Sequence, residues 1–195
     1  CVLGSFSGAA VVFGTLGCFI GYWLGLLLIA FAVLWISCAA VDTSKPQEHD
    51  SKYFRRLVKL YIPAVFSLLR MDIQAEGMEK LPGDGRFLLV CNHLNILDPV
   101  LLLGCFPQCQ LAFISKRENA DMFLIGKIMH RLMCQMINRE NDREALKTII
   151  RCIQMIRDDE VSVAVFPEGY TSRDVKLHHF RSGVFKIATK TQVPI

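Results

Sequence analysis

The first 41 residues of the chain include no Asp, Glu, Lys or Arg, and the first charged residue is Asp42. All 22 basic and 18 acidic residues therefore lie after this stretch. As a single helix the stretch would be about 62 Å long, roughly twice the ~30 Å hydrocarbon core of a bilayer. We therefore expect residues 1–41 to form a membrane-embedded helical hairpin whose second pass ends near Val41. A purely soluble protein and a polytopic one are both excluded.

Glycine recurs every four residues within this stretch, at Gly17, Gly21 and Gly25. This spacing lets two helix backbones approach closely in lipid, but glycine is also frequent in membrane helices without such a role. Both interpretations stay open. A cleaved signal peptide is disfavoured, because the apolar stretch is too long and no basic region precedes it. Because the first residue is Cys1 and not Met, we expect a fragment or a processed product.

Residues 42–69 are expected to link the membrane segment to the rest of the chain. Four basic residues lie just after the apolar stretch: Lys52, Arg55, Arg56 and Lys59. Positive charge beside a span marks its cytoplasmic side, so we expect a cell-membrane protein whose remaining residues face the cytoplasm. Residues 53–69 place these groups beside large apolar residues. This favours either a helix in the membrane interface, interrupted at Pro63, or an ordinary core-packed helix.

The composition of the chain argues against several other classes of protein. Its net charge is only +4, and it has no Lys/Arg-rich run interleaved with aromatic residues, so nucleic-acid binding is not expected. Its eight cysteines form no C-x-x-C pair, and the closest two, Cys105 and Cys109, have no further His or Cys partner at zinc-finger spacing. We interpret them as buried thiols in a reducing compartment. Neither a metal nor a bound cofactor is therefore expected.

Residues 70–195 alternate short apolar runs with helical periodicity, which indicates an α/β domain with an at least partly parallel sheet. Strands are expected at 71–75, 86–91, 110–114, 134–138 and 161–166. Helices are expected near 99–105, 119–131, 142–157 and 183–190, with a loop at 174–182. Helix 142–157 is the clearest, because its isoleucines form one stripe and Asn141 precedes Glu144 as in a capping box. A further strand begins at Val193, so we expect a domain truncated at its C-terminal end.

A first polar cluster directly follows the strongest predicted strand, in the octapeptide Asn92-His93-Leu94-Asn95-Ile96-Leu97-Asp98-Pro99. Residues five apart on a helix point about 140° away from each other, so His93 and Asp98 cannot share a helical face. With His93 at the strand exit and Asp98 as the helix cap before Pro99, a tight loop can bring imidazole and carboxylate together. A carboxylate on Nδ1 raises the basicity of Nε2, as a general base requires. The alternative is that Asp98 only caps the helix and His93 is an ordinary loop residue.

A second cluster also follows an apolar strand, in Phe166-Pro167-Glu168-Gly169-Tyr170-Thr171-Ser172-Arg173. If both strands are parallel, this cluster lies at the same sheet edge as His93, where ligands bind in open α/β sheets. An acid, a glycine, two hydroxyls and an arginine suit a turn that approaches an anionic ligand. The alternative is a simple turn in which Gly169 supplies a positive φ and Arg173 is solvated.

Taken together, the two motifs make the chain similar to the membrane glycerolipid acyltransferases, and most closely to the bacterial 1-acyl-glycerol-3-phosphate acyltransferases. The H-x4-D block of that family matches His93 and Asp98, its F-P-E-G block matches 166–169, and its V-P-I block matches 193–195. The resemblance covers about residues 70–195. It implies an α/β fold with a mixed sheet flanked by helices and preceded by a membrane hairpin.

The resemblance also implies a reaction, the transfer of a fatty acyl group to 1-acyl-glycerol 3-phosphate in phospholipid biosynthesis. The donor would be a thioester co-substrate, acyl-CoA or acyl carrier protein, and the partners would include membrane phospholipid; the oligomeric state is left open. His93 would be the general base and Asp98 would orient it. The residues implied to bind the acceptor and its phosphate are Lys116, Arg139, Glu168, Gly169 and Arg173. The family often reads E-G-T-R-S, whereas here the arginine is displaced two places, to Arg173.

Other functions stay open on the sequence alone. The acceptor could be glycerol 3-phosphate or a lyso-amino-lipid, because the motifs are shared. A metal hydrolase using His93, Asp98 and Glu168 is an alternative, although no second His lies near either motif. Cys91 suggests an acyl-cysteine route, but a strand residue at that position is expected in the core. A non-catalytic membrane scaffold is disfavoured because four motifs occur in the family order: the three blocks above and, between the first two, the arginine of Met136-Ile137-Asn138-Arg139.

Overall fold

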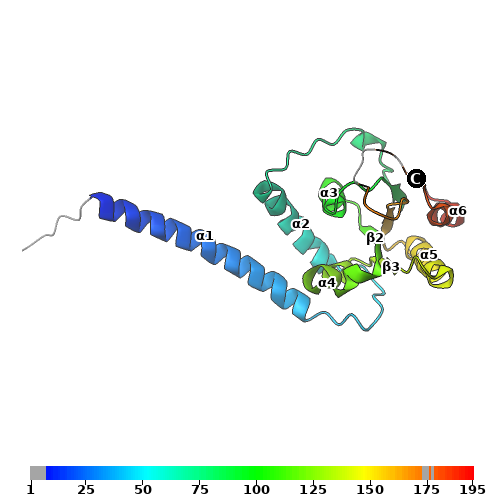
Figure 1. Cartoon of the computed structure of the whole chain (residues 1–195), viewed down its shortest axis with the longest axis horizontal. Helices are drawn as coiled ribbons and strands as arrows, with labels where there is room; N and C mark the ends of the chain where they lie inside the picture. Colours follow the sequence, from blue (N-terminus) through cyan, green and yellow to red (C-terminus); the bar gives the residue numbers. More distant parts are fainter. Residues whose placement is uncertain (1–7, 173–175, 177) are drawn as a thin grey trace, which may run out of the picture. The chain divides into compact units, whose positions relative to one another are not determined.

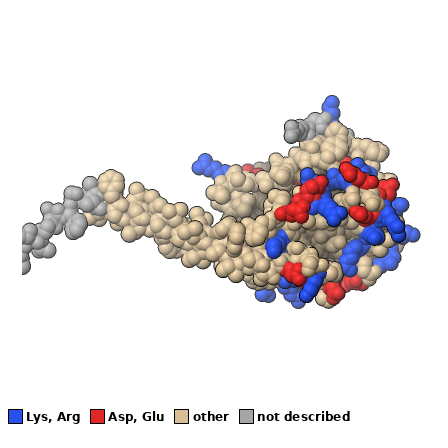
Figure 2. Space-filling model, turned by 60° about the horizontal axis from the view of Figure 1, so that its bottom comes forward, with Lys and Arg blue, Asp and Glu red and all other residues tan. Residues whose placement is uncertain are grey.

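The computed structural model describes residues 8–172, 176 and 178–195. The chain divides into two compact units, Cys1–Val41 and Asp42–Ile195 (Figure 1). The second unit begins at the first charged residue of the sequence. In the space-filling view, lysine, arginine and acidic side chains are spread over the second unit, and the helix of the first unit carries none (Figure 2).

The first unit contains one continuous helix of 32 residues, α1 (Gly8–Ala39). The predicted hairpin is therefore not formed within the described residues of this unit. The reason is local: no proline or charge interrupts the stretch, and isolated glycines weaken a helix without ending it. Its part Val11–Ala39 is a candidate membrane span by length and composition. An added Cβ at any glycine of the four-residue ladder would meet no atom within 4 Å, so no second helix packs there within the described chain.

The second unit is built around four strands: β1 (Leu88–Val90), β2 (Leu111–Lys116), β3 (Gln135–Ile137) and β4 (Ser162–Val165). Their order in the sheet is β1-β4-β2-β3. Every pairing among them is parallel, so the antiparallel part of the expected mixed sheet is not found among the described strands. The strand predicted at 71–75 is not formed either. That segment precedes the short 3₁₀ turn η1 (Met78–Lys80) and has no regular structure. Its short alternation of apolar and polar residues finds no neighbouring strand to pair with.

The C-terminal residues lie along the outer edge of β1. The backbone N–H of Leu88 donates to the carbonyl oxygen of Pro194 over 3.0 Å. Residues 193–195 thus occupy the side of β1 that β4 leaves open, where the sequence predicts the beginning of a further strand.

Helices cover both faces of the sheet (Figure 1). On one side lie α5 (Asp142–Arg157) and α6 (Lys186–Thr191), the latter preceded by η3 (Ser182–Phe185). On the other side lie α2 (Lys52–Leu68), α3 (Asp98–Cys105) and α4 (Phe123–Arg131), with η2 (Arg117–Asp121) ahead of α4. The prediction for 142–157 is confirmed, whereas the helix predicted at 119–131 divides into η2 and α4. The main core combines strand residues with the inner faces of α5 and α6: Leu88, Ala112, Met133, Ile149, Cys152, Met155, Ile156, Val161, Val163, Val165, Ile187 and Ala188.

Helix α2 continues through Pro63 instead of breaking there as predicted. Close packing against α3 stabilises α2 across the proline. The contact is so close that a Cβ added at Gly104 of α3 would overlap the ring of Phe66 of α2. The buried side chains of α2 are Phe54, Leu57 and Ile62. Leu60 and Leu68 are 70% and 83% exposed, so the helix packs on the core along one side and presents apolar residues on another.

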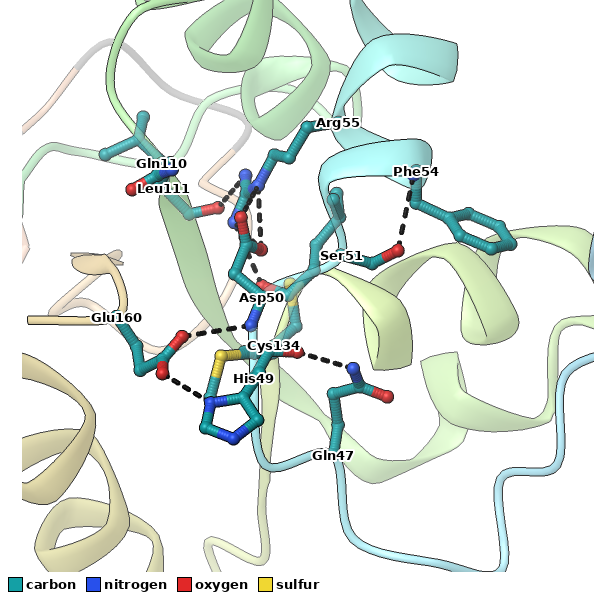
Figure 3. Close-up of polar contacts among 12 residues, drawn as sticks. Gln47, His49, Asp50, Ser51, Phe54, Arg55, Gln110, Leu111, Cys134 and Glu160 are labelled. Atoms are coloured by element: carbon teal, nitrogen blue, oxygen red, sulfur yellow. Dashed lines mark hydrogen bonds and ion pairs between the residues drawn. The ribbon is translucent and has the colours of Figure 1, made fainter. Parts of the chain in front are cut away.

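The segment that precedes α2 is tied to the region just before β4 (Figure 3). His49 Nδ1 lies 2.6 Å from Glu160 Oε1, and the N–H of Asp50 donates to Glu160 Oε2 over 3.1 Å. The hydrogen bond to Glu160 raises the pKa of His49, and the same bond lowers the pKa of Glu160. Ser51 then caps α2, because its hydroxyl accepts the N–H of Phe54 over 3.4 Å.

Arg55 lies in the same region and joins it to β2 through largely buried hydrogen bonds (Figure 3). Its Nε donates to Asp50 over 2.9 Å, and its Nη1 donates to the carbonyl of Leu111, at the start of β2, over 2.7 Å. The side chains of Arg55 and Asp50 are only 15% and 6% exposed. Arg55 is therefore not a free member of the basic group predicted beside the membrane, whose exposed members are Lys52, Arg56 and Lys59.

Candidate active site

The two sequence motifs meet at the carboxyl edge of the sheet. The loop with His93 follows β1, the loop with Phe166 follows β4, and these neighbouring strands are parallel. The backbone N–H of Ser172 donates to the carbonyl of His93 over 2.8 Å and joins the two loops. The parallel register therefore places both motifs where α/β sheets bind their ligands.

His93 and Asp98 form a hydrogen-bonded pair, with Nδ1 of the ring 2.9 Å from Oδ2 of the carboxylate. The same oxygen accepts the backbone N–H groups of Leu94 (2.8 Å) and Asn95 (2.9 Å). Because this oxygen is held as an acceptor, Nδ1 carries the proton and Nε2 is the basic nitrogen. Nε2 has no hydrogen-bond partner within the described residues.

Asp98 is the first residue of α3 and not its N-cap, which is Leu97. The predicted cap does not form, because the carboxylate reaches back to the loop and binds the N–H groups there. Pro99 follows within the first turn, where a missing N–H costs nothing. The negative charge still lies in the first turn of the helix, where the helix dipole favours it. The alternative in which Asp98 only caps the helix is therefore excluded.

An aromatic stack fixes the ring of His93. The centroid of the Phe166 ring lies 4.3 Å from that of His93, with 25° between the planes. Phe113 of β2 stacks on Phe166 in turn, at 6.2 Å. The carboxylate at one nitrogen and the aromatic face thus fix the orientation of the imidazole and, with it, the position of Nε2.

Cys91 lies two residues before His93 and is the nucleophile of the acyl-cysteine alternative. Burial, assisted by the negative charge of Asp98, raises the pKa of the Cys91 thiol to about 12. Because the thiolate is the reactive form, such a thiol is inert near neutral pH. The raised pKa therefore gives the acyl-cysteine alternative no support.

A cavity of about 520 Å³ opens beside the aromatic stack. Its apolar lining comes from Ile114, Ile137, Ala145, Leu146, Ile149, Val165, Phe166, Pro167 and Val184. Its charged lining comes from Arg139, Asp142, Arg181 and Lys186. The ring of Phe166 both lines this cavity and stacks on His93. A cavity that combines cations with apolar walls suits an anionic amphiphile.

The structure brings only some of the predicted site residues to this cavity. Arg139 and Gly169 line it. Lys116 ends β2 at the same sheet edge, but its side chain is exposed and does not line the cavity. Glu168 is 2% exposed, and neither of its carboxylate oxygens has a hydrogen-bond partner within the described residues. Arg173 lies outside the described residues.

Arg181, which the sequence reasoning missed, lies beside Gly169. Gly169 has a φ of +79°, and a Cβ added there would be 3.2 Å from Nε of Arg181 and 3.8 Å from Cζ of Arg139. Burial lowers the pKa of Arg139, and the positive charge of Arg181 lowers it further. In the sequence Arg181 is a lone arginine in a predicted loop. Its position in the sequence gives no sign of a functional role, because only the tertiary fold brings Arg181 close to Arg139.

The metal-hydrolase alternative requires His93, Asp98 and Glu168 to converge on one ion. Within the part of the chain that the structure describes, no three His, Cys, Asp or Glu side chains lie close enough to hold a metal. The carboxylate of Asp98 is instead occupied by His93 and two backbone N–H groups. Among the described residues, therefore, the geometry gives this alternative no support.

The chain is similar to known acyltransferases in sequence and in fold. The acyltransferase family model matches residues 72–195. A Mycoplasma pneumoniae protein named "Probable 1-acyl-sn-glycerol-3-phosphate acyltransferase" is 30% identical over 174 residues, which are 87% of this chain and 63% of that protein. A chloroplastic 1-acyl-sn-glycerol-3-phosphate acyltransferase of Brassica napus is 32% identical over 146 residues, 74% of this chain and 41% of its own length. The crystal structure of the 1-acyl-sn-glycerophosphate (LPA) acyltransferase PlsC from Thermotoga maritima superposes with a TM-score of 0.65 at 26% identity, over 88% of this chain and 67% of that one.

The fold and the site define an α/β protein with a His–Asp pair and a cationic cavity at the carboxyl edge of a parallel sheet. The chain belongs to the acyltransferase family, whose model matches residues 72–195. The resemblance drawn from the motifs at His93 and Phe166 is therefore confirmed. The chain spans less than two thirds of the length of both curated relatives named above.

Proposed function

We propose that this protein transfers a fatty acyl group from a thioester to the free hydroxyl of 1-acylglycerol 3-phosphate and so forms phosphatidic acid. The observation that carries the proposal is the His93–Asp98 pair, in which Nδ1 is hydrogen-bonded and Nε2 is left to act as a base. The names of the Mycoplasma pneumoniae and Brassica napus relatives, which share this region of the chain, support the choice of acceptor.

His93 acts as the general base of the proposed reaction. Its Nε2 takes the proton of the acceptor hydroxyl while that oxygen attacks the carbonyl carbon of the thioester. The tetrahedral intermediate then breaks its C–S bond, and the imidazolium returns the proton to the leaving thiolate. An ester C–O bond thus replaces the thioester bond without net change of charge. Asp98 keeps Nδ1 protonated and stabilises the transient imidazolium, and general-base help of this kind contributes about 10²–10⁴-fold.

The acceptor phosphate binds in the cation-lined cavity, with Arg139 as its first contact. A guanidinium matches a phosphate group with two parallel charged hydrogen bonds. Lys116 and Arg173 are proposed as further cations for the acceptor, and Gly169 lets the ligand approach the backbone. Glu168 is proposed to hold an acceptor hydroxyl, because a buried carboxylate without a donor is unfavourable and a hydroxyl supplies that donor.

The proposed acceptor is a lipid, so the enzyme must work at a membrane. We propose that α1 is the anchor, in keeping with the length and apolar composition of Val11–Ala39. The exposed Lys52, Arg56 and Lys59 that follow in sequence favour a cytoplasmic location for the second unit. Single cysteines placed at positions 52 and 59 should react with a membrane-impermeant reagent only after the cells are opened. Labelling of intact cells would reverse the orientation.

The proposed activity is tested with membranes from cells that express the full-length gene. Acyl-CoA and acyl carrier protein thioesters are each offered with 1-acylglycerol 3-phosphate, glycerol 3-phosphate and a lyso-amino-lipid. We expect 1-acylglycerol 3-phosphate to be the fastest acceptor, with one of the two donors preferred. A chelator should leave this rate unchanged, because the mechanism uses no metal and no cofactor besides the thioester. Faster transfer to another acceptor would replace the proposed substrate.

A further inference from the structure

Two arginines from distant parts of the sequence converge on one turn of the cavity. Arg139 follows β3 and Arg181 precedes η3, yet both guanidinium groups lie within 4 Å of the Cβ position of Gly169. The backbone of Arg181 is held in place, since its N–H donates to the carbonyl of Pro167 over 3.0 Å. The second arginine is therefore attached directly to the turn that contains Gly169.

Positive charge dominates around this turn, although the negative charge of Glu118 also acts on Arg139. Neither Arg139 nor Arg181 forms an ion pair with a described residue, and their proximity lowers the pKa of Arg139 beyond the effect of its burial. Lys186 adds a third positive charge to the cavity lining, and Asp142 is its only described carboxylate. Two guanidinium groups held together without an intervening anion repel each other, so an anionic ligand between them is favoured.

The position of the pair relative to the base indicates which anion it receives. Phe166 lines the cavity that contains both arginines and also stacks on His93, so this one side chain adjoins both the cavity and the proposed base. In 1-acylglycerol 3-phosphate the phosphate and the free hydroxyl are on adjacent carbons of glycerol. A phosphate bound between the arginines therefore restricts where the hydroxyl can lie relative to the base.

We infer that Arg181 and Arg139 together form a two-arginine clamp for the phosphate monoester of the acceptor, in which Arg181 supplies the second guanidinium. This inference rests on the proposed function and goes beyond it by naming Arg181 as a determinant of acceptor specificity. Two forked guanidinium groups match a phosphate monoester dianion better than a neutral glycerol hydroxyl or a phosphodiester, which carries one charge fewer. The clamp thus selects acceptors with a terminal phosphate.

The first test compares Arg181→Gln with wild type in detergent-solubilised full-length protein. The KM for 1-acylglycerol 3-phosphate should rise about 10- to 100-fold, the loss expected for a charged hydrogen bond, while the KM for the acyl donor stays within about twofold. Arg181→Lys should recover part of the lost acceptor affinity, because lysine keeps the positive charge and lacks only the paired donors of the guanidinium. The matched control is Arg143→Gln, which removes the same charge from an exposed position on α5 outside the cavity lining and should leave both KM values unchanged.

A second readout separates the clamp from the reaction. Millimolar inorganic phosphate and glycerol 3-phosphate should raise the thermal unfolding midpoint of wild type and of Arg143→Gln, but not that of Arg181→Gln. If wild type binds phosphate in this way and yet does not acylate 1-acylglycerol 3-phosphate, the proposed function fails while the clamp stands. An unchanged acceptor KM in Arg181→Gln overturns the clamp. So does a KM increase confined to the acyl donor, which would assign Arg181 to the phosphates of coenzyme A.

Discussion

Ser172, in the loop after β4, donates its backbone N–H to the carbonyl oxygen of His93, in the loop after β1, over 2.8 Å. Ser172 is 3% exposed, so water does not compete for this hydrogen bond. The bond couples the backbone of the proposed base to the loop that contains Gly169. Changes in the phosphate-binding turn are therefore expected to affect both halves of the site.

Replacement of His93 by alanine should abolish transfer and leave the protein folded and membrane-bound. The side chain lies at the sheet edge and is 19% exposed, so its loss opens no core cavity. The two motifs contain no second imidazole that could replace it as the base. Turnover is measured with 1-acylglycerol 3-phosphate, and folding is checked by thermal unfolding. Activity above about a tenth of wild type would contradict the general-base mechanism, which requires at least ~10²-fold.

Asp98→Asn should have a smaller effect than His93→Ala. The amide oxygen of asparagine can still accept the N–H groups of Leu94 and Asn95, so the loop is kept. The imidazole remains, but the charge that holds its Nδ1–H and stabilises the imidazolium is lost. The expected order of turnover numbers is wild type, then Asp98→Asn, then His93→Ala. An Asp98→Asn enzyme as active as wild type would show that the 2.9 Å contact has no part in catalysis.

Arg139→Ala should raise the KM for the phosphate-bearing acceptor much more than the KM for the thioester. A lost charged hydrogen bond costs about 1.5–3 kcal/mol, which corresponds to roughly a 10- to 150-fold increase. The two constants are measured by varying each substrate at saturating levels of the other. Equal increases for both substrates would remove Arg139 from the acceptor site.

Gly169→Ala should damage the proposed phosphate site more than the base, whose side chain is held by Asp98 and Phe166. The residue has a φ of +79°, a conformation that costs an alanine about 1–2 kcal/mol. The new Cβ would also lie 3.2 Å from Nε of Arg181, so the arginine must move. We expect a lower unfolding midpoint and a raised acceptor KM, with the donor KM preserved. Gly85→Ala is a suitable control, because Gly85 has a similar φ of +81°, no atom lies within 4 Å of a Cβ there, and it does not line the cavity. Wild-type acceptor affinity in Gly169→Ala would show that the turn does not position the phosphate.

The contact between His49 and Glu160 predicts a pH-dependent contribution to stability. The pKa of His49 is raised, so its contribution is lost as the pH rises through that raised value. The pKa of Glu160 is lowered, so its contribution is lost as the pH falls through that lowered value. The difference in unfolding midpoint between wild type and His49→Gln should therefore be largest between the ordinary values of 4.5 and 6.5, and should vanish in alkaline solution. Glu160→Gln should behave in the same way. A difference that does not vary with pH would mean that the ion pair contributes nothing.

Local features of the sequence determined much of this protein. The uncharged stretch predicted an apolar helical segment, although one continuous helix replaces the expected hairpin within the described residues. The capped isoleucine stripe predicted the helix at Asp142–Arg157. The five-residue spacing of His93 and Asp98 placed both groups within one loop, so the chain itself limits their separation. These features depend on neighbours in sequence, and helical periodicity, caps and short loops are governed by such neighbours.

Features that depend on distant contacts were decided only by the tertiary structure. Residues 71–75 have the pattern of a strand but no partner, and α2 crosses Pro63 because the packing against Gly104 supports it. An exposed arginine and a buried, hydrogen-bonded arginine have the same sequence pattern, so only the contact with Asp50 shows that Arg55 is of the second kind. Arg181 meets Arg139 only because the chain returns to the turn at Gly169. The physical reason is that such contacts join residues far apart in sequence, and their free energy appears only once the core has closed the intervening loops.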